Sequence, residues 1–278
     1  MINIAIIGTG QIGYDLLYKI LHLDFVTIVA FVGRRNPTKK IPDGVKYSDE
    51  SISFFINNPK CCDVVFDCTD AFSAKNNANV FREQGIQVID LTPSNVGDFY
   101  IPNITEINTK NINMITCGGQ ISIPIIKYFK EKLNNITYVE VVTQINSESA
   151  GIATRINIDK YIETTELAIY KITNVCNNKV ILNINPHTEI MQTTIFIKSS
   201  NDFIEFDDFF NYVKKIKEYA PNYTVSKPEK INPNVFMVNI TMISSSNIIV
   251  GSAGNLEIIN CVAIHALRKI YEQSCNKT

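Results

Sequence analysis

Two hydrophobic patterns divide the chain. In the first half, short runs of β-branched residues alternate with segments whose apolar positions recur at helical spacing. This alternation is typical of strand-helix-strand units and predicts a parallel sheet. The expected helices include 13–23 and 73–84, the second ending at Gly85 as a C-cap. The expected strands are 3–7, 25–32, 64–68, 87–91 and 113–117.

The second half carries longer apolar runs and amphipathic segments. Residues 157–173 and 206–219 have the apolar spacing of helices, and a last helix is expected at about 256–273. The pattern predicts a mostly antiparallel sheet covered by helices. The segment 221–233, with three prolines, is expected to be an exposed loop. The expected strands are 138–145, 180–184, 191–198 and 235–243.

These elements predict an α/β protein with an N-terminal Rossmann-type parallel sheet, a second α+β domain and a C-terminal helix. The expected domains are a dinucleotide-binding domain at 1–130, a catalytic and dimerisation domain at 131–252, and a helix at 253–278 that packs back on the first domain. A length of 278 residues suits this division, because single cores stop growing at roughly 250 to 300 residues.

Composition and charge exclude several classes of partner. A hydrophobic content of 45% and a net charge of -1, without a run of basic residues, favour a globular protein that binds neither nucleic acid nor a membrane. The N-terminus lacks the pattern of a signal peptide. Seven scattered cysteines indicate the reducing cytoplasm rather than a disulfide framework. With only three histidines, no metal site is expected.

A glycine motif follows the first expected strand and opens the first expected helix: Gly8-Thr9-Gly10-Gln11-Ile12-Gly13. The first glycine permits a tight turn, the second lets the backbone approach a pyrophosphate, and the third packs the helix against the strand. The free N–H groups of the helix N-terminus favour phosphate there. The motif predicts a dinucleotide site, and the alternative is a glycine turn with a purely structural role.

The end of the second strand offers a clue to the cofactor. A Rossmann domain usually carries Asp or Glu there to bind the ribose 2′-hydroxyl of NAD, whereas this chain has Arg34 and Arg35. Two arginines can bind a 2′-phosphate, so NADP should be accepted. The alternative is that both side chains point into solvent.

A cysteine is the candidate nucleophile. Cys117 is expected to end a strand, next to two glycines and just before a helix, where a thiol pKa is lowered and backbone N–H groups can stabilise an oxyanion. The alternative of a small buried cysteine fits Cys68, Cys176 and Cys261 better. A parallel sheet brings its strand ends to one edge, so the cofactor and the thiol should be neighbours. That arrangement suits oxidation of a thiohemiacetal to a thioester.

Several longer stretches extend this interpretation. They include residues 6–16 around the glycine motif, Ile89-Asp90-Leu91-Thr92-Pro93 and Asn113-Met114-Ile115-Thr116-Cys117-Gly118-Gly119-Gln120. Later stretches are Ser149-Ala150-Gly151, Thr154-Arg155, Ile158-Asp159, Glu163-Thr164-Thr165 and Ala253-Gly254-Asn255-Leu256. Together they resemble the acylating acetaldehyde dehydrogenase family, whose members convert short aldehydes, coenzyme A and NAD to acyl-CoA and NADH.

The resemblance implies roles for particular residues. It makes Cys117 the residue that carries the acyl thioester, and it implies a small aldehyde or an acyl-CoA, or a carrier-bound acyl thioester, as substrate, with coenzyme A as co-substrate. It also favours a homodimer formed through the sheet of the second domain. Asn255 is either an N-cap of the last helix or a ligand of the nicotinamide carboxamide. The implied cofactor contacts are Thr9, Gly10, Gln11, Ile12, Ser149, Ala150, Gly151, Ile152, Ala153, Thr154, Arg155, Ile156, Asn157 and Asn255.

Three departures from the family pattern matter. Where the family has an Arg-Asp pair, with the Asp assisting proton transfer, this chain has Gln192 and Thr193, and a threonine is no carboxylate base. The Pro-Gly pair after Ser-Ala-Gly is Ile152-Ala153 here. The region after Tyr223 is shorter than in the family, which leaves the partnership with a 4-hydroxy-2-oxovalerate aldolase open.

Two other functions remain as alternatives. A semialdehyde or acyl-phosphate dehydrogenase has the same fold but pairs its thiol with a histidine, and no histidine here has such a setting. An inactive dinucleotide-binding homologue would explain Thr193, but the intact Thr116 to Gln120 block argues against it. His187 and Glu189 are the nearest candidates in sequence for a general base.

Overall fold

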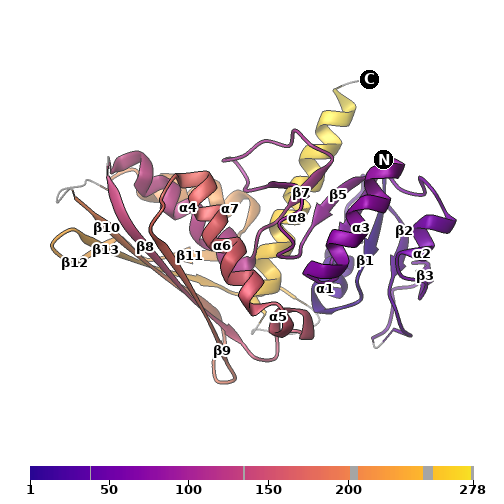
Figure 1. The fold of residues 1–278 in the computed structure, drawn as a ribbon, viewed down its shortest axis with the longest axis horizontal. Helices are drawn as coiled ribbons and strands as arrows, with labels where there is room; N and C mark the ends of the chain where they lie inside the picture. Colours follow the sequence, from indigo (N-terminus) through magenta and orange to yellow (C-terminus); the bar gives the residue numbers. More distant parts are fainter. Residues whose placement is uncertain (38, 134, 201–205, 247–252, 277–278) are drawn as a thin grey trace. The chain divides into compact units, whose positions relative to one another are not determined.

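The structure is a computed structural model that describes residues 1–37, 39–133, 135–200, 206–246 and 253–276 (Figure 1). By its internal contacts the chain forms two units, described separately below. The first consists of Met1–Met114 with Ala263–Thr278, and the second of Ile115–Val262. The domain boundaries expected from the sequence stay a prediction.

The first unit is built on a parallel sheet of seven strands in the order β3-β2-β1-β4-β5-β7-β6. All six pairings are parallel, as the alternating pattern predicted. The interior strand β1 is buried on both faces, which explains why its apolar residues do not alternate with polar ones. The strands are β1 (Ile2–Ile7), β2 (Val26–Val32), β3 (Tyr47–Ser48), β4 (Val64–Asp67), β5 (Gln87–Asp90), β6 (Asp98–Phe99) and β7 (Asn111–Asn113).

The first unit also contains three helices that connect strands of this sheet, α1 (Gln11–Ile20), α2 (Ser53–Asn57) and α3 (Ala71–Gln84). Helix α3 begins at Asp70, whose side chain accepts hydrogen bonds from two backbone N–H groups, and ends at Gly85 with a φ of 69°. The predicted C-cap is therefore confirmed, because glycine adopts this left-handed conformation without steric cost. Phe55 of α2 packs edge-on against Phe81 of α3, with ring centroids 5.0 Å apart.

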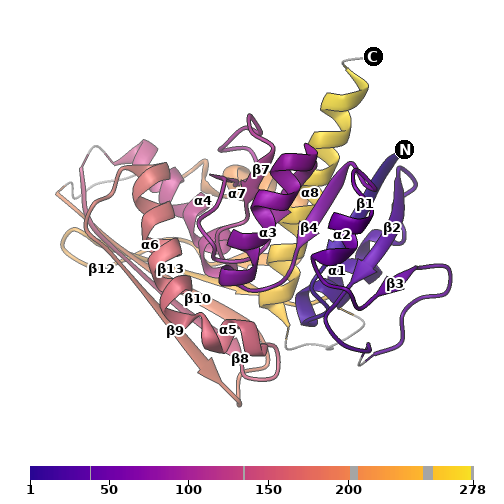
Figure 2. The same ribbon diagram turned by 45° about the vertical axis from the view of Figure 1, so that its right-hand side comes forward.

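The second unit holds a six-stranded sheet in the order β11-β13-β10-β8-β9, with β12 added on β13. Strands β8 and β9 are parallel and the other pairings are antiparallel, as expected. Helices α4 (Cys117–Lys132), α6 (Ile158–Thr173) and α7 (Phe209–Tyr219) lie on one face of this sheet (Figures 1 and 2). The strands are β8 (Ile136–Asn146), β9 (Asn178–Asn185), β10 (Met191–Ser199), β11 (Tyr223–Val225), β12 (Glu229–Asn232) and β13 (Val235–Met242).

The expected loop at 221–233 is wrong, because this segment contains β11 and β12. Its prolines flank these strands, so no ladder hydrogen bond is lost. Tyr223 is fully buried, pairs with Met242 and donates a hydrogen bond from its hydroxyl to the carbonyl of Ile121 at 2.8 Å. Burial of this aromatic side chain outweighs the local turn signal.

The last helix, α8 (Gly254–Cys275), begins two residues before the expected start. Gly254 permits a close approach, since a Cβ there would lie 2.2 Å from the Met242 carbonyl oxygen. In the first unit, the ring of Tyr271 stacks on that of Phe25 with centroids 4.8 Å apart. Within the described ranges, no helix is both long and apolar enough to cross a membrane.

Candidate active site

The glycine loop joins β1 directly to α1, and two of its glycines are required by space. Gly8 has a φ of 108°, and a Cβ on it would lie 2.4 Å from the Cys68 backbone. A Cβ on Gly13 would lie 2.0 Å from the Gly8 carbonyl oxygen. Gly10 differs, because a Cβ there would meet no atom within 4 Å. The loop is thus closed on the protein side and open at Gly10, where the predicted pyrophosphate would approach.

The rest of the loop is held by neighbouring residues. Thr9 lies against Gly33, whose missing side chain leaves room for it. Gln11 and Ile12 form the start of α1, and Gly10 is its N-cap residue without a side-chain cap. The first N–H groups of α1 therefore receive no side-chain acceptor from the cap position, as a phosphate-binding helix end requires.

The two arginines lie just beyond β2 and are exposed. Partial burial opposes ionisation of Asp70, but hydrogen bonds from Ser73 and Phe72 and the charge of Arg34 together lower the pKa of its carboxyl. Arg34 therefore interacts with the N-cap of α3, and Arg35 is fixed through its backbone, whose carbonyl accepts a hydrogen bond from Tyr47.

Two buried carboxyl groups lie at the ends of β4 and β5 and were not predicted as site residues. Asp67 and Asp90 are register partners on adjacent parallel strands. Asp67 accepts hydrogen bonds from Thr69 and Asn77, and Asp90 accepts them from Thr92, Ser94 and Asn113. Burial and then the charge of Asp67 raise the pKa of Asp90 to about 7. The available signal was an acid at the last position of two successive strands.

Cys117 is the first residue of α4 rather than the last residue of a strand. The strand expected at 113–117 ends at Asn113, and a sharp turn follows in which Ile115 has a φ of 62°. A β-branched residue is rarely found in this left-handed region, which costs of order 1–3 kcal/mol. The turn thus places the thiol at a helix N-terminus, and no sequence pattern revealed its strain.

Thr116 caps α4 and orders its first turn. Its hydroxyl accepts a hydrogen bond from the Gly119 N–H at 2.9 Å and lies 2.6 Å from the Thr165 hydroxyl. Because Thr165 donates its proton to the Tyr161 carbonyl, Thr116 must donate to Thr165. The Gly119 N–H is therefore already paired within the chain.

The thiol of Cys117 is not poised as the sequence indicated. Burial raises its pKa to about 11, although hydrogen bonds from Tyr161 and from the backbone N–H groups of Gly118 and Cys117 oppose this shift. The hydrogen bonds at the helix N-terminus act in the expected direction, but desolvation outweighs them, and no cationic group among the described residues contributes to the shift.

Three buried hydroxyl groups extend from the sulfur. The Cys117 Sγ lies 3.7 Å from the Tyr161 hydroxyl, Tyr161 is hydrogen-bonded to Thr143, and Thr143 lies 3.0 Å from Thr193. Thr193, which replaces the expected carboxylate, thus lies at the end of a chain that leads to the thiol. Tyr161 and Thr143 were missed because each sits at an ordinary buried position of a helix or strand.

The later cofactor candidates form one local group in the second unit. Ser149 and Ala150 are buried, and the Ser149 carbonyl accepts a hydrogen bond from the Asn255 Nδ2 at 3.2 Å. Gly151 precedes the short helix α5 (Ile152–Ile156), and Asn157 follows it. Ile152 and Ile156 are 78% and 76% exposed, and Thr154 is partly buried. The Arg155 Nε donates a hydrogen bond to the Ala150 carbonyl. The side chain of Ala153 lies outside the described part.

Asn255 lies inside the first turn of α8, so its expected role as the N-cap is wrong. Its side chain is buried, and among the described residues its Oδ1 has no hydrogen-bond partner. A buried amide oxygen without a donor is costly, and an N–H donor from a ligand would satisfy it.

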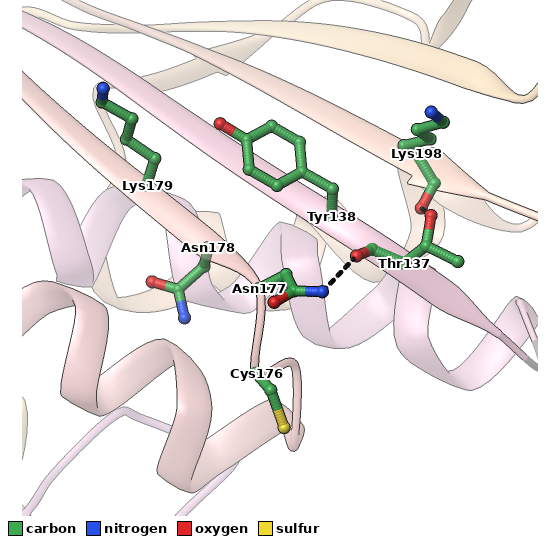
Figure 3. Close-up of a pocket in the computed structure, with 7 residues that line it drawn as sticks. All are labelled: Thr137, Tyr138, Cys176, Asn177, Asn178, Lys179 and Lys198. Atoms are coloured by element: carbon green, nitrogen blue, oxygen red, sulfur yellow. Dashed lines mark hydrogen bonds between the residues drawn. The ribbon is translucent and has the colours of Figure 1, made fainter.

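The remaining candidates lie elsewhere. Cys68 is buried as expected, whereas Cys176 is exposed, because it lies in the connection between α6 and β9. Figure 3 shows a pocket beside Cys176, with the side chains of Tyr138, Lys179 and Lys198 rising from three neighbouring strands. Tyr138 and Thr143 differ by an odd number of positions on β8, so they point to opposite faces of the sheet. The pocket is therefore separated from Cys117.

His187 and Glu189, the sequence candidates for a base, are both exposed on the turn between β9 and β10. His22 and His265 belong to the first unit, where His265 Nδ1 lies 2.9 Å from the Tyr100 hydroxyl.

Solved structures share this fold. The chain resembles aspartate semialdehyde dehydrogenase II from Vibrio cholerae, solved in complex with ASA, with a TM-score of 0.68 at 14% identity, covering 95% of this chain and 98% of that one. It also resembles the Candida albicans aspartate semialdehyde dehydrogenase solved with NADP, with a TM-score of 0.66 at 14% identity, covering 97% and 99%. The fold class predicted from the sequence is confirmed.

Sequence comparisons are more specific. Residues 3–115 match the family described as semialdehyde dehydrogenase, NAD binding domain, and residues 117–250 match prokaryotic acetaldehyde dehydrogenase, dimerisation. The chain is 38% identical to the acetaldehyde dehydrogenase of Spirochaeta aurantia, covering 99% of this chain and 96% of that protein. It is also 38% identical to that of Pectobacterium atrosepticum, covering 95% and 93%. The resemblance inferred from the motifs is thus confirmed, and the chain belongs to the acetaldehyde dehydrogenase family.

Proposed function

We propose that this protein is an acylating aldehyde dehydrogenase, which interconverts a short aldehyde and an acyl-CoA through a thioester on Cys117. The observation that carries the proposal is the position of this thiol. It stands at the N-terminus of α4, after a strained turn and next to a buried hydroxyl group. The relatives named acetaldehyde dehydrogenase match this chain over nearly its whole length, including this block.

In the oxidative direction the Cys117 thiolate attacks the aldehyde carbon and forms a thiohemiacetal. Loss of a hydride, for which a bound nicotinamide would be the acceptor, and of the hydroxyl proton to water leaves a thioester on the sulfur. The thiolate of coenzyme A then attacks this thioester and releases acyl-CoA and the Cys117 thiolate. The reductive direction is the reverse, and a carrier-bound acyl thioester would enter by the same attack.

Each unit, taken by itself, offers residues that fit part of a nicotinamide dinucleotide. The loop from Gly8 to Gly13 is open at Gly10, and Asn255 offers a buried oxygen that suits the carboxamide N–H. When bound, such a cofactor supplies the hydride acceptor or donor. The group of residues from Ser149 to Asn157 is the further proposed contact.

Arg34 and Arg35 support acceptance of both NAD and NADP. Both are exposed at the end of β2, where a 2′-phosphate would lie in a Rossmann domain, and no acidic side chain stands at these two positions to repel it. Arg34 already interacts electrostatically with the Asp70 carboxyl, so Arg35 is the stronger candidate for a phosphate contact.

The proposed assembly is a homodimer through the open face of the second sheet. This face carries partly exposed apolar side chains on four neighbouring strands: Val142, Ile181, Phe196 and Met237. Apolar side chains that lie next to one another on four strands form a continuous patch, which a second copy of the chain could cover. The matching family description, which contains the word dimerisation, supports this proposal.

The test is turnover of acetaldehyde with coenzyme A and either NAD or NADP, followed by the absorbance of the reduced cofactor. We expect activity that requires coenzyme A, is lost in Cys117→Ala and is retained in Cys176→Ala, which removes an exposed cysteine. Dependence on phosphate instead of coenzyme A would favour the semialdehyde or acyl-phosphate dehydrogenase alternative. Cofactor binding without turnover in either direction would favour the inactive homologue.

The cofactor preference is tested in the same assay. We expect Arg35→Ala to raise the KM for NADP more than the KM for NAD, because only NADP carries the 2′-phosphate. A strict NAD preference that neither Arg34→Ala nor Arg35→Ala changes would contradict this assignment.

A further inference from the structure

The chain of hydroxyl groups behind Cys117 is closed off within the second unit. Tyr161 of α6, Thr143 of β8 and Thr193 of β10 are 5%, 0% and 1% exposed. The Cys117 Sγ lies 3.7 Å from the Tyr161 hydroxyl, and the Thr143 and Thr193 hydroxyl oxygens lie 3.0 Å apart. Three hydroxyl groups from three elements therefore connect the sulfur to the centre of the sheet.

The Tyr161 oxygen is held in place by two hydrogen bonds. The hydroxyl of Thr143 and the backbone N–H of Gly118, which the oxygen shares with the Cys117 sulfur, are its partners. Gly118 has to be glycine for this approach, since a Cβ there would lie 2.1 Å from the Tyr161 oxygen and 3.2 Å from the Thr143 oxygen. A phenol oxygen has two acceptor sites, so when both groups donate, the one hydroxyl proton remains for the sulfur.

The direction of the chain depends on the state of the sulfur. A protonated thiol can donate to Tyr161, and the hydroxyl protons then point away from the sulfur. A thiolate can only accept, so Thr193 donates to Thr143, Thr143 donates to Tyr161, and Tyr161 donates to the sulfur. Threonine can occupy the end of this chain in both directions, whereas an ionised carboxylate can only accept.

We propose that Tyr161 is a catalytic residue that stabilises the thiolate form of Cys117 by donating a hydrogen bond from its hydroxyl to the sulfur, and that Thr143 and Thr193 are positioning residues that orient this hydroxyl. The proposal rests on the proposed role of Cys117 as the nucleophile. No bond breaks in Tyr161: its proton stays on the phenol oxygen, and burial, which raises the phenol pKa well above its usual value, keeps it there.

The surroundings leave this hydrogen bond as the main local control of the thiol. Among the described residues, the titratable group that faces the Cys117 sulfur is Tyr161. The elements packed around it present hydroxyl groups and glycine rather than charges: Thr165 from α6, Gly118 and Gly119 from α4, Thr143 from β8 and Thr193 from β10. A neutral donor therefore acts where many reactive thiols have a cation.

The experiment measures the rate at which iodoacetamide alkylates Cys117 in the full-length protein, across a range of pH and without cofactor. Peptide mass spectrometry separates Cys117 from the exposed Cys176 and Cys275. The variants are Tyr161→Phe, Thr193→Val and Thr193→Ser. Tyr212→Phe is the matched control, since it removes another partly buried tyrosine hydroxyl of the same unit. That hydroxyl donates a hydrogen bond to the Pro124 carbonyl at 2.8 Å.

We expect Tyr161→Phe to lower the alkylation rate at about pH 8 by about tenfold, because only the thiolate reacts and a hydrogen bond to a charged group shifts its pKa by about one or more. Thr193→Val should lower the rate by about twofold or more, while Thr193→Ser and Tyr212→Phe should match the wild type. A rate in Tyr161→Phe that equals or exceeds that of the wild type overturns the proposal.

If Tyr161→Phe does not fold, the Thr193 pair decides the question: equal rates in Thr193→Val and Thr193→Ser overturn the proposal. The result is distinguishable from a failure of the proposed function. Turnover that survives in Cys117→Ala would refute the nucleophile, whereas the alkylation rates report the bond between Tyr161 and the sulfur irrespective of turnover.

Discussion

The buried carboxyl pair of the first unit predicts an unusual pH dependence of stability. Asp67 and Asp90 occupy paired positions on β4 and β5, and Asp90 is 2% exposed. The perturbation is Asp90→Asn, which keeps the shape of the side chain and one acceptor oxygen but cannot titrate. We expect it to remove most of a stability term that the wild type loses between acidic and neutral pH.

The sign of this pH dependence follows from whether the folded or the unfolded state binds the Asp90 proton more tightly. Burial, and then the charge of Asp67, raises the pKa of Asp90 from 3.8 to about 7 in the folded protein. Between about pH 4 and about pH 7 the folded state therefore binds more protons than the unfolded state, and the free energy of unfolding falls as pH rises. The full difference corresponds to on the order of 4 kcal/mol. Asp67, whose pKa burial also raises, retains a slope of the same sign.

His265 contributes with the opposite sign in part of this range. Burial lowers the pKa of this histidine, so its contribution to stability is lost as pH falls below the ordinary value of 6.5. The informative quantity is therefore the free energy of unfolding of the wild type minus that of Asp90→Asn at each pH. This difference cancels His265 and isolates the carboxyl.

The assay is urea unfolding followed by far-UV circular dichroism, because the chain contains no tryptophan. Asp98→Asn, which removes an exposed carboxyl on β6, is the matched control. We expect the difference between wild type and Asp90→Asn to shrink steadily from about pH 5 to about pH 7 and then to level off. A difference that is constant, or that grows with pH, would refute the reasoning.

Further predictions concern substitutions at four positions. Gly13→Ala should destabilise the protein by about 1–3 kcal/mol in thermal unfolding, because its Cβ would lie 2.0 Å from a backbone oxygen, whereas Gly10→Ala should leave the melting temperature unchanged and weaken NAD binding in calorimetry. Asp70→Ala should cost about 1 kcal/mol in urea unfolding by removing the cap of α3, and Asp70→Asn should recover most of it. Gly118→Ala should displace the Tyr161 hydroxyl and slow both turnover and alkylation of the thiol, with little loss of circular dichroism signal.

The parts of the fold that could be predicted are those encoded by local periodicity. The parallel sheet, the mostly antiparallel second sheet and the α3 C-cap at Gly85 all follow from short-range patterns of apolar residues and glycine. The segment 221–233 was mispredicted, because burial of Tyr223 against Ile121 depends on contacts a hundred residues away. Short strands such as β3 and β6 were missed because two residues carry no period.

The residues of the candidate site also fall into those that the local sequence indicates and those that only the folded structure brings together. The glycine loop and Cys117 could be proposed as site residues because the residues that indicate their chemistry are adjacent in the sequence. Tyr161, Thr143 and Thr193 come from three elements that meet only in the folded unit, and each alone is an ordinary buried position. The strain at Ile115 was equally invisible, since isoleucine gives no sign of a positive φ.

The sequence predicted a lowered pKa for the Cys117 thiol, and the raised pKa in the structure shows which physical effect dominates at this site. A helix N-terminus stabilises a nearby anion by up to about 1 kcal/mol at exposed positions, whereas removing an anion from water costs more. At Cys117 the second effect is larger, and the pKa rises to about 11. Because no cation in the described part of the chain contributes to this shift, thiolate formation depends on hydrogen bonds from neutral donors. The orientation of the Tyr161 hydroxyl is therefore decisive for the reactivity of Cys117, and the identity of residue 193 matters through that orientation rather than as a base.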